Sequence, residues 1–213
     1  MNKFFLVSMI CASCIFYDFL GADCNKLPKD SNEKLADNHI QGVFHEIQTE
    51  LRKKYPLSIM YQRGEENEKK LKIISVGFVA DTSLFLNQDK SRELIVYCTE
   101  VMLKILYQDK GFQSYFKNMP FTYKNLAIII FLIDPCCQDV KYEKPIIYLT
   151  GMENGLITYA EKDLSKPFKS HPKVTQKEFL KNFNILEESY EEALKIVQAQ
   201  SIETTPKNNQ EGI

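Results

Sequence analysis

The stretch Leu126–Ile133, which reads LAIIIFLI, decides the fold of this chain. All eight residues are apolar, four of them are isoleucine, and Asp134-Pro135 ends the run. A short, unbroken apolar run rich in β-branched side chains is typical of a strand that is buried on both faces. Such a strand lies inside a sheet, so the segments around it must supply its neighbours.

A hairpin is predicted directly after this strand. Ile146–Met152 and Leu156–Ala160 are rich in strand-forming residues, and Glu153-Asn154-Gly155 lies between them. A two-residue turn of the mirror-image type needs positive φ at both positions, which Asn and Gly adopt with the least strain. We therefore expect two antiparallel strands joined at Asn154-Gly155.

The segment before the central strand opens with a helix and a second hairpin. The helix ends at Tyr55-Pro56, and Leu57–Gln62 and Leu71–Ala80 are expected to pair as strands around a charged loop at Arg63–Lys70. The apolar face of the helix has spacings of three and four residues and consists of Ile40, Val43, Phe44, Ile47 and Leu51.

Two further helical segments separate that hairpin from the central strand. Asp89 is the expected cap of a long helix that runs to about Tyr107, with Cys98 on its apolar face. Gly111 ends this helix, and Phe112–Lys117 forms one more turn. The aromatic residues around Pro120 indicate a corner where a helix packs over a sheet end, with a ligand groove as the alternative; they are Phe112, Tyr115, Phe116, Phe121 and Tyr123.

The C-terminal part is expected to be a loop and two helices. Asp163–Lys173 has loop composition, and Thr175 with Glu178 matches a capping box that would open a short helix. A last helix is expected over Leu186–Gln198, and its solvated face would carry Glu187, Glu188, Glu191 and Glu192. The predicted fold class is α+β, a mainly antiparallel sheet of about five strands with helices packed on it.

The first residues have the pattern of an export signal. Lys3 precedes an apolar block from Phe4 to Leu20, and small residues come before Asp23. A membrane anchor is the alternative, but Asp18 and two serines interrupt the block. A buried N-terminal helix is a third interpretation. We predict an export signal at residues 1–22, a linker at 23–38, one α+β domain at 39–200 and a disordered tail at 201–213.

Two cleavage sites fit this segment. A cut after Ala22 would give a soluble protein in the periplasm or outside the cell. Cys11-Ala12-Ser13-Cys14 instead resembles the lipobox of bacterial lipoproteins, in which Cys14 becomes lipidated. A membrane is therefore expected as a partner only through an uncleaved signal or a lipid anchor.

Composition narrows the classes of function. The chain is 44% hydrophobic and 26% charged, which is ordinary for a globular protein, and its net charge is −1. This balance gives no basic footprint for nucleic acid. With only 8 glycines, a glycine-rich phosphate loop is not expected, and the absence of tryptophan weakens any case for sugar stacking.

The cysteines and histidines give no catalytic or metal motif. We expect one disulfide from Cys24 to Cys136 or Cys137, with no bridge as the alternative, and Cys98 as a buried free thiol. His45-Glu46 lacks the second ligand of a zinc-protease motif, because residue 49 is threonine. His39 and His171 do not have ligand spacing either. No catalytic, cofactor-binding or metal residue is assigned, and no cofactor is expected.

The central block resembles a set of small uncharacterised exported proteins of obligate intracellular bacteria, the chlamydiae and their relatives. The resemblance runs from Ser91–Val96 through Asn118–Thr122 to Leu126–Ile133 and covers about half of the chain. It rests on a Pro-Phe-Thr loop before an apolar strand. It implies export, but no activity and no catalytic residue.

The leading hypothesis is an exported, non-enzymatic binding or interaction domain in the cell envelope or outside the cell, whose ligand is an unknown protein or small molecule. One alternative is a hydrolase or thiol enzyme, with His45 or His171 as base for a cysteine or carboxylate. Another is a lipoprotein with a structural role in the envelope.

Overall fold

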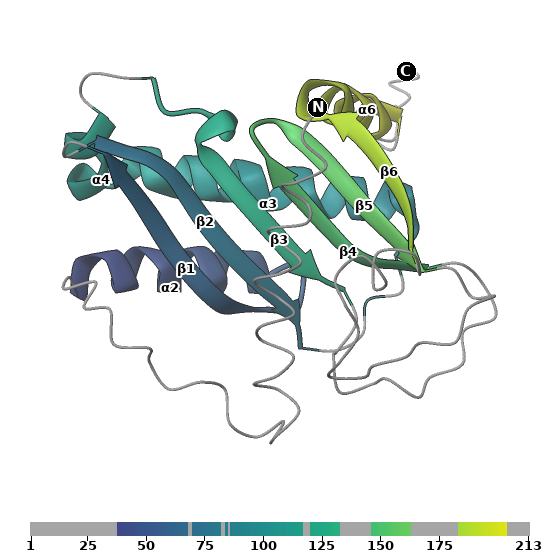
Figure 1. The fold of residues 1–213 in the computed structure, drawn as a ribbon, viewed down its shortest axis with the longest axis horizontal. Coiled ribbons are helices and arrows are strands. Elements are labelled where there is room, and N and C mark those ends of the chain that lie inside the picture. Colours follow the sequence, from purple (N-terminus) through teal and green to yellow (C-terminus); the bar gives the residue numbers. More distant parts are fainter. Residues whose placement is uncertain are drawn as a thin grey trace, which may run out of the picture.

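The computed structural model describes residues 38–67, 70–81, 84, 86–116, 120–132, 146–162 and 183–203. They form a six-stranded sheet with helices packed on it (Figure 1). The elements in chain order are α2 (Asn38–Arg52), β1 (Leu57–Asn67), β2 (Lys70–Ala80), α3 (Gln88–Gln108), α4 (Lys110–Phe116), the short 3₁₀ turn η1 (Tyr123–Asn125), β3 (Leu126–Phe131), β4 (Ile146–Glu153), β5 (Leu156–Lys162), β6 (Phe183–Ser189) and α6 (Tyr190–Glu203).

The strands lie side by side in the order of the sequence, from β1 to β6. Every neighbouring pair is antiparallel except β2 and β3, which are parallel because α3 and α4 carry the chain back across the sheet between them. The prediction of an α+β fold with a mainly antiparallel sheet is confirmed. The strand β6 was missed, so the described sheet has one strand more than expected.

The first helix forms as the sequence predicts. The apolar residues of α2 at spacings of three and four are buried, except that Ile40 is half-buried, and Ile47 and Leu51 have no exposed surface. The helix ends at Arg52, just before Tyr55-Pro56. Its buried face packs on α3 and on the hairpin of β1 and β2.

The long helix α3 runs across the sheet and carries the largest part of the core (Figure 1). Its cap is Asn87, whose side chain accepts a hydrogen bond from the backbone N–H of Lys90 at 2.9 Å. The expected cap, Asp89, lies instead in the first turn, where a carboxylate is favourable beside the positive end of the helix dipole. Gly111 lies inside α4, the short extra turn predicted after α3.

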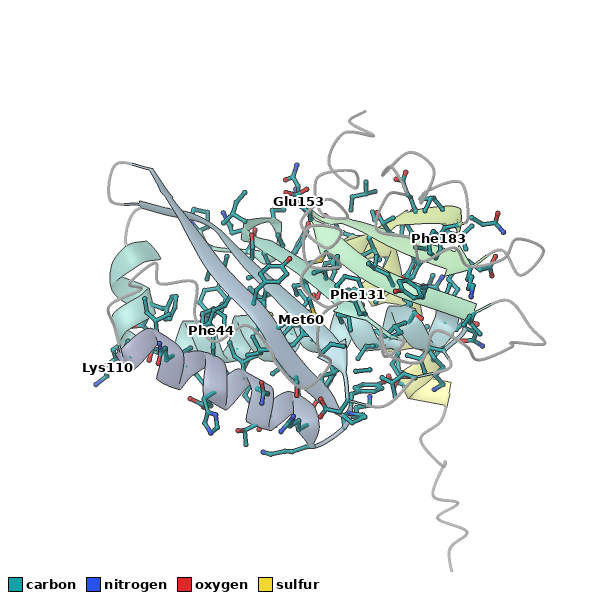
Figure 2. All side chains as sticks on the ribbon, turned by 60° about the horizontal axis from the view of Figure 1, so that its bottom comes forward. Phe44, Met60, Lys110, Phe131, Glu153 and Phe183 are labelled. Atoms are coloured by element: carbon teal, nitrogen blue, oxygen red, sulfur yellow. The ribbon has the colours of Figure 1, made fainter. Side chains whose placement is uncertain are left out.

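The strand β3 is buried on both faces, as its composition predicts. Ile128 and Ile130 belong to the core beneath α2 and α3, and neither has exposed surface. Ile129 and Phe131 belong to a second buried cluster on the opposite face, together with Phe183 (Figure 2). The sheet therefore separates two apolar clusters, and β3 contributes to both.

The hairpin of β4 and β5 turns at the predicted residues. Asn154 has φ of 49° and Gly155 has φ of 75°. Both positions are therefore left-handed, as the two-residue mirror-image turn requires. The prediction from Asn154-Gly155 is confirmed.

Two other predictions were wrong. Arg63–Asn67 is strand and not loop, because β1 and β2 continue their pairing as far as Asn67 and Lys70. Leu186–Ser189 is strand and not helix, and α6 begins only at Tyr190. The helix α6 then continues to Glu203, three residues into the segment expected to be a tail.

Several predictions concern residues outside the described ranges. They are the export signal, the linker up to residue 37, the loop at Asp163–Lys173, the capping box at Thr175, and residues 204–213 of the tail. Among the described residues, none of the helices combines the length and the apolar character that a membrane span requires.

Candidate functional site

The histidines and cysteines singled out from the sequence do not come together in the described part of the chain. His45 is exposed on the outer face of α2. Cys98 is fully buried in α3, and burial raises the pKa of its thiol well above the usual value, so it is held as an unreactive thiol. Cys14, Cys24, Cys136, Cys137 and His171 lie outside the described residues.

His39 contacts a carboxylate, and the sequence did not predict this contact. Its Nε2 lies 2.8 Å from Oδ1 of Asp109, which joins α2 to the start of α4. The same oxygen accepts a hydrogen bond from the backbone N–H of Phe112 at 2.8 Å. Burial would raise the pKa of Asp109, but the hydrogen bonds from Phe112 and His39 outweigh it and hold that pKa below its usual value. These contacts of Asp109 stabilise the start of α4.

The described residues offer no metal site and bury two members of the aromatic group. No cluster of three or more His, Cys, Asp or Glu side chains within these ranges could hold an ion. Phe112 and Phe121 are buried in the main core, and the hydroxyl of Tyr107 donates to the carbonyl of Phe121. These two residues fit the interpretation of a packing corner and not a ligand groove.

The largest polar network of the described core lies beneath β6. Nε of Arg92, on α3, is 2.8 Å from Oε1 and 3.0 Å from Oε2 of Glu188, and its Nη1 is 2.5 Å from Oδ1 of Asp89. The hydroxyl of Tyr159, on β5, also donates to Glu188. The side chains of Arg92 and Glu188 are only 9% and 13% exposed. Glu188 therefore points toward α3, and the expectation that it lies on a solvated helix face was wrong.

A second set of tyrosines fixes the start of α6. The Tyr190 hydroxyl donates to Oε1 of Glu100, on α3, at 2.5 Å. Tyr190 also stacks on Tyr123 with ring centroids 4.5 Å apart, and the Tyr123 hydroxyl donates to Glu191. Burial, followed by the bond to Glu100, raises the pKa of Tyr190, so this hydroxyl stays protonated and keeps donating. The strand β6 and the helix α6 are thus held as one unit on α3.

A capping box joins β6 to α6. The backbone N–H of Glu192 donates to Oγ of Ser189 at 3.2 Å, and the backbone N–H of Ser189 donates to Oε2 of Glu192 at 3.2 Å. This reciprocal pair satisfies two donors at the start of the helix. The backbone N–H of Ser189, the last residue of β6, is therefore hydrogen-bonded and not available to another strand.

The direction of the remaining backbone groups of β6 follows from one hydrogen bond. The N–H of Tyr190 donates to the carbonyl of Gly155 at 2.9 Å, and these residues continue the register of β5 and β6. In an antiparallel pair, alternate residues direct both backbone groups at the partner strand. Leu186 and Glu188 therefore face β5, whereas Ile185 and Glu187 direct their N–H and C=O groups away from the sheet.

No described residue covers these outward groups of β6. None of the described strands pairs with the outer edge of β6. Within the described part of the chain, no group accepts a hydrogen bond from the backbone N–H of Ile185 or Glu187. β6 also pairs with β5 through all seven residues without a register shift. It contains no Lys or Pro, two residues that commonly protect a sheet edge, and its charged residues are Glu187 and the inward-pointing Glu188.

The opposite edge, β1, is protected. Oε1 of Gln48, on α2, accepts the backbone N–H of Ile59 at 2.9 Å. Nε of Arg52 donates to the carbonyl of Leu57 at 2.9 Å. The strand also carries two register shifts, and such irregularities disturb the pairing of an edge with another chain. Among the described residues the two edges of the sheet therefore differ: side chains and irregularities cover β1, whereas β6 is regular and has no neighbour on its outer side.

Apolar surface gathers beside the open edge. Five large apolar residues of the described chain are exposed, and four of them belong to β5, β6 or α6. Ile185 is 37% exposed and Leu156 is 43% exposed, and both lie on the sheet face that is turned away from α3. Figure 1 shows β6 at the end of the sheet with α6 beside it.

Comparison of the chain with protein-family models, with curated proteins and with solved structures gave no match. The resemblance to exported proteins of the chlamydiae and their relatives therefore stays a prediction.

Proposed function

We propose that this chain is an exported, non-enzymatic interaction domain that binds an extended segment of a partner protein along β6, as a seventh strand of the sheet. The observation that carries the proposal is the pair of outward-facing N–H groups at Ile185 and Glu187, for which the described residues supply no acceptor. Strand addition to an open edge is a general mode of peptide recognition, in which the backbone supplies affinity and alternate side chains supply specificity.

Rigid support of the edge favours this function. An extended ligand loses conformational freedom when it binds, so an edge that is already ordered lowers the cost of association. The contact of Arg92 with Glu188 and that of Tyr190 with Glu100 hold β6 and α6 on the long helix α3. The strand is therefore presented on the body of the fold and not on a loop.

Export is supported by the sequence alone. The apolar block after Lys3 and the small residues before Asp23 fit a signal peptide. Periplasmic or extracellular location, with or without a lipid on Cys14, is part of the proposal. The enzyme alternative has less support, because His45 is solvent-exposed on α2 and Cys98 is sealed in the core.

Proline substitutions along β6 test whether the outward groups have the proposed direction. Ile185→Pro removes an N–H that has no partner in the described chain, so it should lower stability only modestly. Leu186→Pro, the matched control one residue away, removes an N–H of the β5–β6 ladder and should cost about 3 kcal/mol or more. Urea unfolding followed by circular dichroism measures both. Equal losses for the two variants would contradict the assigned direction.

Binding is tested with a displayed library of random ten-residue peptides selected against the full-length protein. The proposal expects selected peptides to shift the ¹⁵N amide resonances of Ile185 and Glu187, to slow their hydrogen exchange, and to lose affinity for Ile185→Pro. Ile196→Ser on α6 is the control, because Ile196 has the same 37% exposure but lies outside the strand. Selected peptides that perturb other residues and leave β6 unchanged would overturn the proposal.

A further inference from the structure

We infer that the segment bound at β6 is cationic, with Lys or Arg beside Glu187 and an apolar side chain beside Ile185. This inference rests on the function proposed above. It names the chemistry of the partner and excludes a second copy of this chain.

Charge is unevenly distributed along the chain. The whole chain has a net charge of −1, but residues 183–202 contain four glutamates and one lysine, a net charge of −3. The segment that forms the open edge and most of α6 is therefore acidic in a nearly neutral protein. A surface of one sign attracts a partner of the opposite sign and speeds its association.

The acidic residues of this unit have different roles. Glu188 points inward and is neutralised by Arg92. Glu187 is exposed, and it lies two residues from Ile185 on the same face of the strand. Glu191 and Glu192 are also exposed, and hydrogen bonds from Tyr123 and Ser189 lower their respective pKa values, so both stay ionised at neutral pH.

Glu187 sets the side-chain pattern of a complementary strand. Its backbone N–H and C=O groups point away from β5, toward the position of an added strand. A residue of that strand would lie directly opposite Glu187, with its side chain beside the carboxylate. Opposite charges at such cross-strand positions stabilise the pairing, and like charges destabilise it. The residues opposite Leu186 and Ile185 would meet apolar side chains. A basic residue flanked by apolar residues therefore fits this edge.

A second copy of this chain fits poorly at the same edge. Antiparallel pairing of two β6 strands would bring two acidic units together, because Glu187, Glu191 and Glu192 outnumber Lys195 in each unit even after Arg92 neutralises Glu188. No lysine or arginine in β6 could meet Glu187 of the other copy. Like charges would thus oppose self-association. The edge therefore needs no proline or lysine to prevent pairing with β6 of a second copy.

Three blocked heptapeptides test the charge preference on the full-length protein. The first is Thr-Lys-Val-Val-Val-Lys-Thr, whose lysines near both ends place one beside Glu187 in either strand direction. The other two carry Gln or Glu in place of both lysines. The inference expects the Lys peptide to bind about two- to fivefold more tightly than the Gln peptide, and the Glu peptide to bind more weakly than both. Raising the salt from about 50 to 300 mM should narrow these differences.

Charge reversal at Glu187 provides the matched test. Glu187→Lys should invert the order of the Lys and Glu peptides, whereas Glu46→Lys, on the exposed face of α2, should leave it unchanged. If Glu187→Lys does not fold, Glu187→Gln should bring the Lys and Gln peptides to equal affinity.

The outcomes separate this inference from the proposed function. Equal affinity of the three peptides, with amide shifts at Ile185 and Glu187, would overturn the charge preference and leave strand addition standing. Selected library peptides and heptapeptides that all leave those two amides unshifted would overturn both. A concentration-dependent dimer in analytical ultracentrifugation that Ile185→Pro dissolves would make a second copy the occupant, and the cationic partner would be excluded.

Discussion

Arg92 on α3 binds Glu188 on β6 through Nε, which lies 2.8 Å from one carboxylate oxygen and 3.0 Å from the other. The two residues are 96 positions apart in the sequence and both are largely buried. The contact ties the last strand of the sheet to the central helix. It also lets a charged residue occupy an inward position of an edge strand, because the guanidinium replaces the water that the carboxylate loses.

Removing either charge of this pair should therefore be costly. We expect Arg92→Met to lower the free energy of unfolding by about 2–4 kcal/mol, since it leaves Glu188 partly buried and uncompensated. The double variant Arg92→Met with Glu188→Gln should lose less than the sum of the single losses, with a coupling of about 1–3 kcal/mol. Urea unfolding of the four proteins in the cycle measures this energy.

An exposed ion pair provides the control for this cycle. Lys53 pairs with Glu50 at the end of α2, and its side chain is 65% exposed. Lys53→Met should change stability far less than Arg92→Met does. Strictly additive losses at Arg92 and Glu188, or a loss at Lys53 as large as at Arg92, would mean that the buried pair does not hold β6.

The elements that the sequence predicts well are those with a local cause. The unbroken apolar run of Leu126–Ile133 predicts a strand buried on both faces, and Asn154-Gly155 predicts a turn with two positive φ angles. The helical spacing of the apolar residues before Tyr55 likewise predicts α2. Each of these signals lies within the segment that it describes.

The candidate site could not be found in this way, because its causes are distant in the sequence. Glu187-Glu188 between apolar residues fits a helix as well as a strand, and only Arg92 makes the inward position of Glu188 favourable. The outward direction of two amides depends on pairing with β5. One local signal was available: Ser189 and Glu192 have the spacing of a capping box, which places the start of a helix after β6.

The turn at Gly155 gives a test of backbone strain. Gly155→Val should destabilise the protein by about 1 kcal/mol or more, because φ of 75° is strained for a β-branched residue. A Cβ atom there would also lie 2.8 Å from Cε2 of Tyr123. Thermal unfolding measures the loss.

Gly42 is the matched glycine control. It lies inside α2, and a Cβ atom added there would meet nothing within 4 Å. Gly42→Ala should therefore stabilise the protein by about 0.5–1 kcal/mol. A gain at Gly155 similar to that at Gly42 would argue against the strained turn.

Large-to-small changes in β3 should show whether each of the two apolar clusters contributes to stability. Ile130→Ala opens a cavity beneath the helices, and Ile129→Ala opens one on the opposite face of the sheet. We expect a loss of about 2–5 kcal/mol for at least one of them, as for other buried isoleucines. Urea unfolding measures both variants, and values near zero for both would mean that this strand is not in the core.

Acid should weaken the contact that Glu93, on α3, makes with Lys54, just after the end of α2. Hydrogen bonds from Lys54 and Lys90 lower the pKa of Glu93 from its usual 4.5 to about 2. The stabilisation is therefore complete above about pH 4.5 and is lost as the pH falls toward 2. Because solvent screens these exposed lysines, the ionised Glu93 carboxylate contributes only about 1 kcal/mol to the free energy of unfolding.

The variant Glu93→Gln isolates this contribution. It should be less stable than the wild type at pH 7, and the difference should disappear by about pH 2, where the wild-type carboxylate becomes protonated. Urea midpoints measured at several pH values follow the difference. A constant difference over that range would exclude Glu93 as the titrating group.

The capping box at Ser189 is expected to set the boundary between β6 and α6. Ser189→Ala removes the oxygen that accepts the backbone N–H of Glu192, and loss of such a cap costs about 1 kcal/mol. Glu192→Gln keeps an acceptor for the backbone N–H of Ser189 and should cost less, because Gln also serves in a capping box. Hydrogen exchange followed by NMR should show faster exchange in the first turn of α6 for Ser189→Ala, with no change at Tyr159 in the neighbouring strand. Equal exchange at the first turn in both variants and the wild type would mean that the stacked pair of Tyr190 and Tyr123 positions the helix without the cap.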